Sequence, residues 1–399
     1  MTEKMPSSQR KPEAGSGVVV ILAIVLLIVL VAGVVPGIKK LKDSMGDGQT
    51  ARAPVTTGAT TGLAKIWSVN IHPPRILELA LSPTGRGEFL ALNGDDHIHR
   101  FDSSGERRDQ FRAPEKSSRL VTDPSGRFPY SLIVSSKSKW TGAIDFKVPT
   151  DYYLQALDGR GTEVWKVRLD PKQVSVLDPV VATIDRFGYP AILLSASQRI
   201  LCFSANGTRL WDAPVRHYPG TLAAADLDGD GVQEILAART PLSDIVRIDA
   251  SGQALGPWVA GHGPTRLRAE PMRGSAEVYA ATLRQVFRPQ PGGVQLALSF
   301  FASNGNLLGE FDLPKNASLP SHSPLAAIDL DGSGRRSWIM ALGDGSIHLF
   351  SPSGGLRKVE HIGQRIRTFL VLPRPNAPDL LIVATQRGLT AWSAAGLAR

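Results

Sequence analysis

Short apolar runs separated by polar turns cover the chain from residue 63 onward. In each repeat an apolar run is followed by a loop, a second apolar run, a turn, a short phrase that ends in glycine, and a last strand-like run. The second runs are rich in Leu, Ile, Val and Ala and lack a clean alternation, as expected for strands that are covered on both faces. The pattern predicts four short strands per repeat and almost no helix.

The glycine phrase recurs seven times along the chain. Its copies are Phe101–Gly105, Leu157–Gly161, Phe203–Gly207, Ile248–Gly252, Phe301–Gly305, Phe350–Gly354 and Trp392–Gly396. Successive glycines lie 42 to 56 residues apart, a period typical of four-stranded propeller blades. The sequence therefore predicts an all-β fold, a seven-bladed β-propeller over residues 63–399. The longest interval holds either an insertion around Trp140 or a degenerate further blade.

The two ends of this region are expected to share one blade. Trp165 and Trp211 stand four residues after their turn glycine, in the last strand of their repeats. The last repeat stops soon after Gly396, without such a strand, whereas Leu63-Ala-Lys-Ile-Trp67 has the missing pattern. We expect residues 64–71 to form the outer strand of the seventh blade, which closes the ring and removes its open edges.

The residues before the propeller divide into three segments by composition. Residues 1–16 are polar, residues 17–38 contain a continuous aliphatic run long enough for a transmembrane helix, and residues 39–62 have the composition of a flexible linker. A cleaved signal peptide is the alternative for the apolar segment, but no good cleavage site follows it directly. Basic residues flank both of its ends, so charge leaves the orientation open.

A polar loop between two apolar runs carries the clearest candidate chemistry. Asp226, Asp228 and Asp230 stand at every second position, and Glu234 follows at position nine. This spacing puts hard oxygen ligands on one side of a loop, as Ca²⁺ needs. An EF-hand has its acid at position twelve and helices on both sides. Here the acid comes earlier and the flanking runs have the composition of strands.

This loop resembles that of the FG-GAP or VCBS repeat, the blade type of integrin-alpha propellers. The resemblance implies a structural Ca²⁺ held by Asp226, Asp228, Asp230, the Val232 carbonyl and Glu234. The alternative is a polar turn without metal.

The sixth repeat holds a weaker copy of the loop. Asp329, Asp331 and Ser333 occupy the ligand positions, but two arginines follow and position nine is a serine. Two carboxylates beside two arginines make a poorer calcium site.

A second resemblance concerns the phrase from Ala156 to Trp165, which is similar to the tryptophan-docking repeat of PQQ-type propellers. It covers two or three blades. Quinoprotein dehydrogenases of that type close their cofactor site with adjacent cysteines, and this chain has the single Cys202. We therefore expect shared blade architecture and no PQQ. Cys202 lies in an apolar run and is expected to be a buried thiol.

Two loop faces follow from a four-stranded blade, because the A–B and C–D loops share one face and the D–A and B–C loops share the other. Five histidines precede strand A of their blades on the second face, near the mouth of the central channel. They are His72, His217, His262, His322 and His361. Arginines lie close to them in sequence, namely Arg75, Arg266, Arg365 and Arg367. The histidines either hydrogen-bond neighbouring blades or form a basic, titratable rim for an anionic partner.

Two long B–C connections on the same face place aromatic residues beside basic ones. These residues are Lys137, Lys139 and Trp140 in the second repeat and Phe287 and Arg288 in the fifth. Such a composition is typical of contact patches, although loop aromatics can also fold back on their own blade. His99 and His348 occupy the same place in strand C of two blades, which indicates a packing role.

No catalytic motif stands out, since the chain has no G-x-S-x-G elbow, phosphate loop or H-E-x-x-H pair. The formal net charge of +9 suits an anionic partner. We expect a membrane-anchored binding or scaffold module with a protein or anionic polymer as partner and no nucleic acid. Weak, open calcium loops suit millimolar calcium, which favours a propeller in the periplasm or at the cell surface. The alternatives are an extracytoplasmic hydrolase or lyase with a site at the channel mouth, and a propeller that faces the cytoplasm.

Overall fold

The computed structural model describes residues 63–397 except for short internal segments. The residues left out are 72–74, 85–86, 124–125, 141–146, 171–178, 186, 216–217, 241–243, 262–263, 274–276, 289–292 and 321–323. The chain has two compact units, Met1–Thr60 and Thr61–Arg399, and the described residues belong to the second. The predicted segments 1–16, 17–38 and 39–62 lie outside the described residues. Within the described part, no helix is long and apolar enough to cross a membrane.

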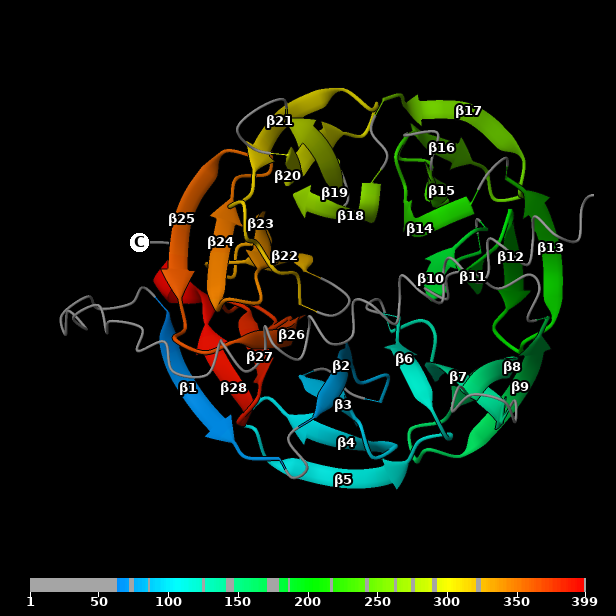
Figure 1. Ribbon diagram of the computed structural model, residues 1–399, viewed down its shortest axis with the longest axis horizontal. Coiled ribbons are helices and arrows are strands. Elements are labelled where there is room, and N and C mark those ends of the chain that lie inside the picture. Colours follow the sequence, from blue (N-terminus) through cyan, green and yellow to red (C-terminus); the bar gives the residue numbers. More distant parts are fainter. Residues whose placement is uncertain are drawn as a thin grey trace, which may run out of the picture. The chain divides into compact units, whose positions relative to one another are not determined.

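In this part of the chain, 28 strands form seven four-stranded antiparallel sheets arranged in a ring, with strand A of each sheet inside and strand D outside (Figure 1). Blade 1 has β2 (Ile76–Leu81), β3 (Glu88–Asn93), β4 (His97–Asp102) and β5 (Arg107–Arg112). Blade 2 has β6 (Ser117–Val121), β7 (Ser131–Trp140), β8 (Lys147–Leu157) and β9 (Glu163–Leu169). Blade 3 has β10 (Pro179–Thr183), β11 (Pro190–Ala196), β12 (Arg199–Ser204) and β13 (Arg209–Pro214).

The remaining blades follow the same order. Blade 4 has β14 (Tyr218–Ala225), β15 (Glu234–Thr240), β16 (Asp244–Ile248) and β17 (Ala254–Val259). Blade 5 has β18 (Pro264–Arg273), β19 (Glu277–Arg288), β20 (Gly293–Ala302) and β21 (Leu307–Asp312). Blade 6 has β22 (Leu325–Asp329), β23 (Arg336–Ala341), β24 (Ser346–Phe350) and β25 (Leu356–His361). Blade 7 has β26 (Ile366–Leu372), β27 (Leu380–Thr385), β28 (Gly388–Ser393) and β1 (Ala64–Val69).

The ring closes in blade 7, where the first strand pairs with the last. β1 runs antiparallel to β28, with Trp67 opposite Ala391 and Val69 opposite Leu389. The closing strand therefore lies within the expected segment 64–71 and ends at Val69. The seven-bladed, four-stranded propeller is confirmed, and the closing strand gives blade 7 its fourth strand.

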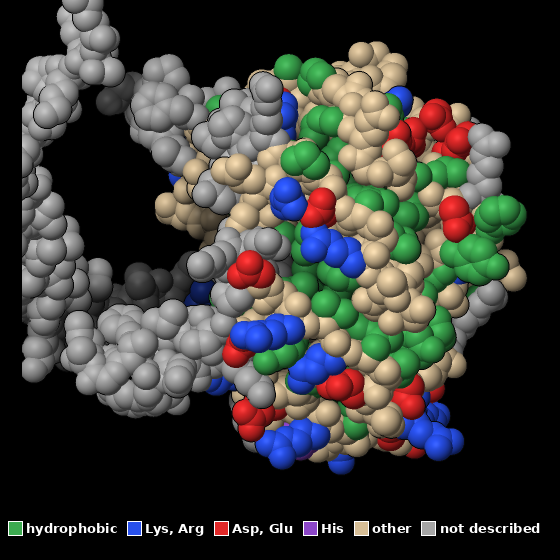
Figure 2. Space-filling model, turned by 90° about the vertical axis from the view of Figure 1, so that its right-hand side faces the viewer, with side chains coloured by type: hydrophobic (Ala, Val, Ile, Leu, Met, Phe, Trp, Pro, Cys, Tyr) green, Lys and Arg blue, Asp and Glu red, His purple; other side chains and the backbone are tan. Residues whose placement is uncertain are grey.

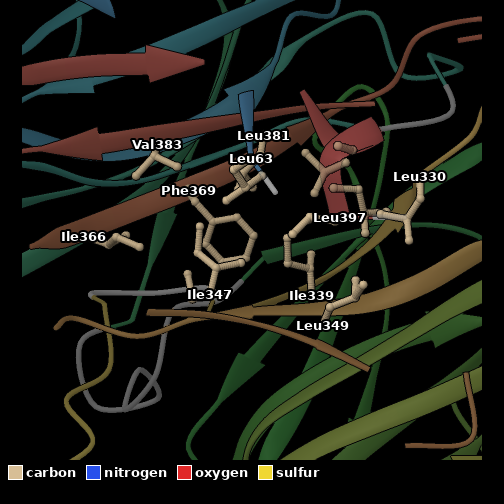
Figure 3. Packing of buried hydrophobic residues seen from close by; sticks show 14 residues of the cluster. Leu63, Leu330, Ile339, Ile347, Leu349, Ile366, Phe369, Leu381, Val383 and Leu397 are labelled. Atoms are coloured by element: carbon tan, nitrogen blue, oxygen red, sulfur yellow. The ribbon is translucent and has the colours of Figure 1, made fainter. Parts of the chain in front are cut away.

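Hydrophobic side chains fill the spaces between neighbouring blades. The cluster between blades 6 and 7 joins Leu63 to Ile347 of β24 and Phe369 of β26, all of them buried (Figure 3). Leu63 comes directly before β1, so the start of the propeller is packed into the same core as its last two blades.

Four tryptophans in outer strands join one blade to the next. They are Trp67, Trp165, Trp211 and Trp258. Each indole N–H donates to a backbone carbonyl in the C–D turn of the following blade, at 2.8 to 3.0 Å. At the first junction, a Cβ on Gly105 would lie 2.7 Å from the Trp67 ring, and Gly105 has φ of +84°. Glycine recurs at this point of the phrase because the backbone is left-handed there and an indole covers the site of a side chain.

Candidate metal loop and binding surfaces

The predicted calcium loop connects β14 to β15 on the face of the A–B and C–D loops. Asp226, Asp228 and Glu234 each offer one carboxylate oxygen within 4.8 Å of the others. The two oxygens of Asp226 accept hydrogen bonds from the backbone N–H groups of Gly229 at 2.8 Å and Gly231 at 3.0 Å. Both glycines have positive φ, +82° and +86°, which residues with a Cβ rarely adopt. Asp226 and the glycines therefore fix the turn that brings the carboxylates together.

Glu234 is the buried member of this group and is 8% exposed. Burial raises the pKa of Glu234, and Asp228 raises it further, whereas a hydrogen bond from the Leu227 backbone and the charge of Arg247 oppose the shift. The Leu227 N–H lies 2.9 Å from Glu234 Oε2, and the Arg247 guanidinium lies 3.8 Å from its Oε1. A cation among the three carboxylates would relieve the repulsion that raises this pKa.

The other two predicted ligands belong to the same loop but not to this group. Asp230 is exposed, and its carboxylate accepts a hydrogen bond from the backbone N–H of Val232 at 2.8 Å. The structure thus brings three of the four predicted carboxylates together and places Asp230 apart from them.

The second loop, in blade 6, has the same turn with different chemistry. Asp329 accepts hydrogen bonds from the backbone N–H groups of Gly332 at 2.8 Å and Gly334 at 2.7 Å. Asp331 lies 3.4 Å from the guanidinium of Arg335. Hydrogen bonds from Ser333 lower the pKa of Asp331 to about 2, and Arg335 adds to the shift. Among the described residues, no group of three acidic, His or Cys side chains forms at this loop.

Most of the predicted partner-binding histidines are not described. His72, His217, His262 and His322 lie outside the described residues. His361 is the last residue of β25 and is exposed.

The two long B–C connections, which the sequence predicted to be loops, are largely strand. Lys137, Lys139 and Trp140 lie in β7, and Phe287 and Arg288 lie in β19. These strands extend as hairpins, in which Trp140 pairs with Lys147 and Arg288 pairs with Gly293. Continued pairing satisfies the backbone N–H and C=O groups that a long loop would leave to water, so the predicted loop residues belong to extended blades.

Three of the arginines predicted near the channel mouth meet in one pocket. Arg75, Arg365 and Arg367 line an open pocket of about 420 Å³ on the face of the D–A and B–C loops, together with Gln386 and backbone and apolar groups. Arg266, the fourth, is not part of its lining. Among the residues that the structure describes, the lining includes no carboxylate, histidine, serine or cysteine.

A pair of exposed aromatics on the opposite face was missed from the sequence. Phe187 and Tyr189, in the A–B loop of blade 3, are 86% and 68% exposed, and their ring centroids lie 6.3 Å apart. The Asp185 carboxylate accepts hydrogen bonds from the backbone N–H groups of both residues, at 3.1 and 2.9 Å. The sequence did contain a signal for this pair. Phe187 and Tyr189 flank a glycine shortly after Asp185, the aspartate that this loop retains.

Other exposed hydrophobic side chains have a different setting. Figure 2 views the ring from the side that carries β13 and shows hydrophobic side chains with scattered charges among them. Val164, Leu210 and Leu255, at 44 to 52% exposed, lie in the outer strands β9, β13 and β17. They are parts of regular strands, whereas the pair in blade 3 lies on the loop between β10 and β11.

Hydrogen bonds join the candidate metal loop of blade 4, residues 226–234, to the aromatic loop of blade 3, which carries Phe187 and Tyr189. The Gln233 backbone N–H donates to the Thr183 carbonyl at 2.9 Å, and the Thr183 N–H donates to the Gln233 side-chain oxygen at 2.7 Å. Gln233 is the last residue of the metal loop, and Thr183 ends β10 two residues before Asp185. These two hydrogen bonds join the end of the blade 4 loop to the strand that leads into the loop of Phe187 and Tyr189.

Three further titratable groups are buried in the blades. His99 and His348 are each 5% exposed, burial lowers the pKa of both, and neither ring nitrogen of His99 has a hydrogen-bond partner. Burial raises the pKa of the Cys202 thiol to about 12, which leaves little reactive thiolate at neutral pH. All three side chains are packed inside the blades.

Comparison with known proteins identifies a fold. No known protein family matches this chain, and no curated protein matches it. The solved structure of BBS1N in complex with ARL6DN, soaked with lead, has a TM-score of 0.56 at 12% identity and covers 84% of this chain and 98% of its own. The WD40 domain of Pan2 from Neurospora crassa has a TM-score of 0.53 at 12% identity and covers 83% of this chain and 95% of its own. The chain is similar to these propellers in fold.

Proposed function

We propose that this protein is a membrane-anchored β-propeller that binds a protein partner and is stabilised by Ca²⁺ in the loop of blade 4. The observation that carries the binding function is the exposed pair Phe187 and Tyr189. Aromatic side chains dominate the energetics of many protein interfaces. Because Asp185 holds the backbone of both residues, little conformational entropy would be lost when the pair docks.

The propeller fold supports a protein as the partner. The neighbour BBS1N was solved in complex with a protein, ARL6DN. Propellers offer loop faces that vary in sequence while the blades keep their packing. By this analogy of fold, the aromatic loop of blade 3 is a candidate contact of the same general kind.

Calcium fits the chemistry of the blade 4 loop. The carboxylates of Asp226, Asp228 and Glu234 are hard oxygen donors within reach of one ion, and Asp230 and the Val232 carbonyl are further candidate ligands. A bound ion would neutralise the carboxylates and fasten strands A and B of the blade. Its role would be structural, since binding to the folded state alone raises stability.

The anchor and the compartment are parts of the same proposal. Residues 17–38 have the length and composition of a transmembrane helix. An open loop with exposed carboxylates suits a compartment with millimolar calcium. A reporter enzyme fused after residue 399 would be active only on the side of the membrane where the propeller lies.

A second binding surface is favoured by the arginines at the channel mouth. Arg75, Arg365 and Arg367 line one pocket and would suit an anionic protein or polymer on the face of the D–A and B–C loops.

Site-specific photo-crosslinking in the cells that make the protein tests the aromatic contact. A photoreactive phenylalanine replaces Phe187 in the full-length chain, and the control chain carries it in place of Val164 of β9, which is 44% exposed. We expect one discrete crosslinked protein at position 187, reduced at least tenfold by Tyr189→Ser, and none at position 164. Equal crosslinking at both positions, or none at 187, would overturn the proposed contact.

A further inference from the structure

A second pocket lies at the junction of blades 6 and 7, on the face opposite the channel-mouth arginines. It has a volume of about 450 Å³ and is lined by residues of the weak blade 6 loop, of β25 and of the end of blade 7. Four of its lining side chains are cationic, namely Arg335, Arg336, Arg357 and Lys358. One lining side chain, Asp331, is anionic. The lining therefore has an excess of positive charge.

The carboxylates nearby pair with three of these cations. Arg335 lies 3.4 Å from Asp331, and Lys358 lies 3.1 Å from Glu360. Arg336 lies 3.8 Å from Glu270 of the neighbouring blade 5. The longer pairs are loose, and exposed ion pairs hold their partners weakly.

Arg357 is the cation that lacks such a partner. Its guanidinium donates to Ser337 Oγ at 3.4 Å, and within the described part of the chain no carboxylate lies at ion-pair distance from it. Arg357 is exposed and is the extra residue of the bulge between β24 and β25. Its charge is therefore available to a ligand.

The base of the pocket is apolar. Leu330, Leu349 and Leu397 line it and are 8%, 1% and 4% exposed. Figure 3 shows these three leucines at one end of the cluster between blades 6 and 7, with Ile366 at the other end. The pocket thus places arginines and a lysine around a hydrophobic floor, a combination found in small-molecule sites of this volume.

The blade 6 loop that lines this pocket has the same turn as the metal loop of blade 4 but carries different side chains. Arg335 and Arg336 occupy the positions of Val232 and Gln233 in the metal loop, and Ser337 occupies that of Glu234. The turn is the same in both blades, but in blade 6 two arginines offset the carboxylates and no third acid is present. A loop that fits a cation in blade 4 fits an anion in blade 6.

We propose that this pocket binds the oxyanion of a small molecule that has an apolar body, either a phosphate monoester or a carboxylate. Guanidinium groups present planar forks of N–H donors that match both oxyanions. The three leucines would cover the apolar body. The proposal does not depend on the calcium loop or on the aromatic contact.

Calorimetric titration of the full-length protein in a neutral detergent tests this binding. The probes are phenyl phosphate, benzoate and inorganic phosphate. We expect phenyl phosphate or benzoate to bind at least tenfold more tightly than inorganic phosphate, because only the first two carry an apolar body. Whichever of them binds more tightly identifies the oxyanion. Equal affinity for all three, or no heat from any of them up to 10 mM, would overturn the proposal.

Matched variants locate the site. Arg357→Gln and Arg335→Gln should each weaken binding of the preferred probe by about tenfold, since each removes a charged hydrogen-bond donor. Arg108→Gln is the control, because Arg108 takes the position in β5 that Arg357 takes in β25, as the extra residue of the corresponding bulge. Exposed Arg335 provides an independent reading if Arg357→Gln fails to fold. Equal losses in Arg108→Gln, or no loss in either pocket variant, would contradict the assignment.

Discussion

The A–B loops of blades 4 and 6 share a backbone turn and differ in chemistry. In both, an aspartate at position one accepts hydrogen bonds from two glycine N–H groups, through Asp226 in blade 4 and Asp329 in blade 6. Position nine then separates them, as buried Glu234 completes a group of three carboxylates whereas Ser337 supplies a hydroxyl. The turn is set by the first aspartate and the glycines, and the ion that the loop suits is set by the later positions.

Arg335 and Arg336 of blade 6 increase the difference in charge between the two loops. Arg335 lies 3.4 Å from Asp331 and supplies locally the positive charge that a metal would bring. The corresponding residue in blade 4 is Val232, which supplies none. Blade 6 therefore keeps the folded turn with a side-chain cation beside it.

Calcium removal is expected to give the largest effect. If calcium at about one hundred times its dissociation constant stabilises the folded state by ~2.7 kcal/mol, chelation should lower the melting temperature of the full-length protein by about 4 °C. Asp228→Asn should abolish this difference, because it removes one of the three clustered charges.

Asp331→Asn is the matched control, as Asp331 has the same position in blade 6. It should leave the calcium-dependent shift unchanged. A shift that survives Asp228→Asn, or that disappears in Asp331→Asn, would reverse the roles assigned to the two loops.

Exchange of the loop chemistry should have a smaller but more specific effect. The combined change Arg335→Val, Arg336→Gln and Ser337→Glu gives blade 6 the residues of blade 4 at positions seven to nine. We expect calorimetry to show two calcium ions bound per chain instead of one. The preferred oxyanion probe should also bind at least tenfold more weakly to the cationic pocket, that is, the pocket at the junction of blades 6 and 7 that Arg335 and Arg357 line. The single change Glu234→Ser should remove the original site. An unchanged stoichiometry in the triple variant would show that the turn and these residues are insufficient.

The sequence predicted the fold well because its signals are local. In the first six phrases the final glycine has a positive φ, as a left-handed turn requires, and at Gly105 and Gly207 an indole also covers it. The pattern around Trp67 likewise predicted the closing strand, because that residue repeats the docking contact of Trp165.

The binding surfaces were less accessible to sequence reading. The cationic pocket joins Arg335 to Arg357, which come together only through the pairing of β23, β24 and β25. The exposure of Phe187 could not be predicted either, because it depends on which other parts of the chain lie beside its loop in space. The predicted partner residues of the B–C connections failed as loop residues because strand pairing continued through positions such as Lys139 and Gln285.

A pH comparison in chelator should give the smallest effect, with opposite signs in the two loops. Burial raises the pKa of Glu234 above its ordinary value of 4.5. The stability gained from its protonated form is therefore full below pH 4.5 and is lost as the pH rises through the raised pKa. Glu234→Gln, which keeps an oxygen for the Leu227 N–H, should raise the melting temperature slightly at pH 7 and leave it unchanged at pH 4.

For Asp331, hydrogen bonds from Ser333 hold the pKa at about 2, below its ordinary value of 3.8. Its ionised form contributes stability above pH 3.8, and this contribution is lost as the pH falls through about 2. Asp331→Asn should therefore lower the melting temperature slightly at pH 7, opposite in sign to Glu234→Gln. If both substitutions stabilise the metal-free protein at pH 7, the ionised carboxylates are unfavourable in both loops. The arginines of blade 6 would then not neutralise the charge of their loop. Opposite signs would show that blade 4 retains an uncompensated negative charge, the condition for it to take up a cation.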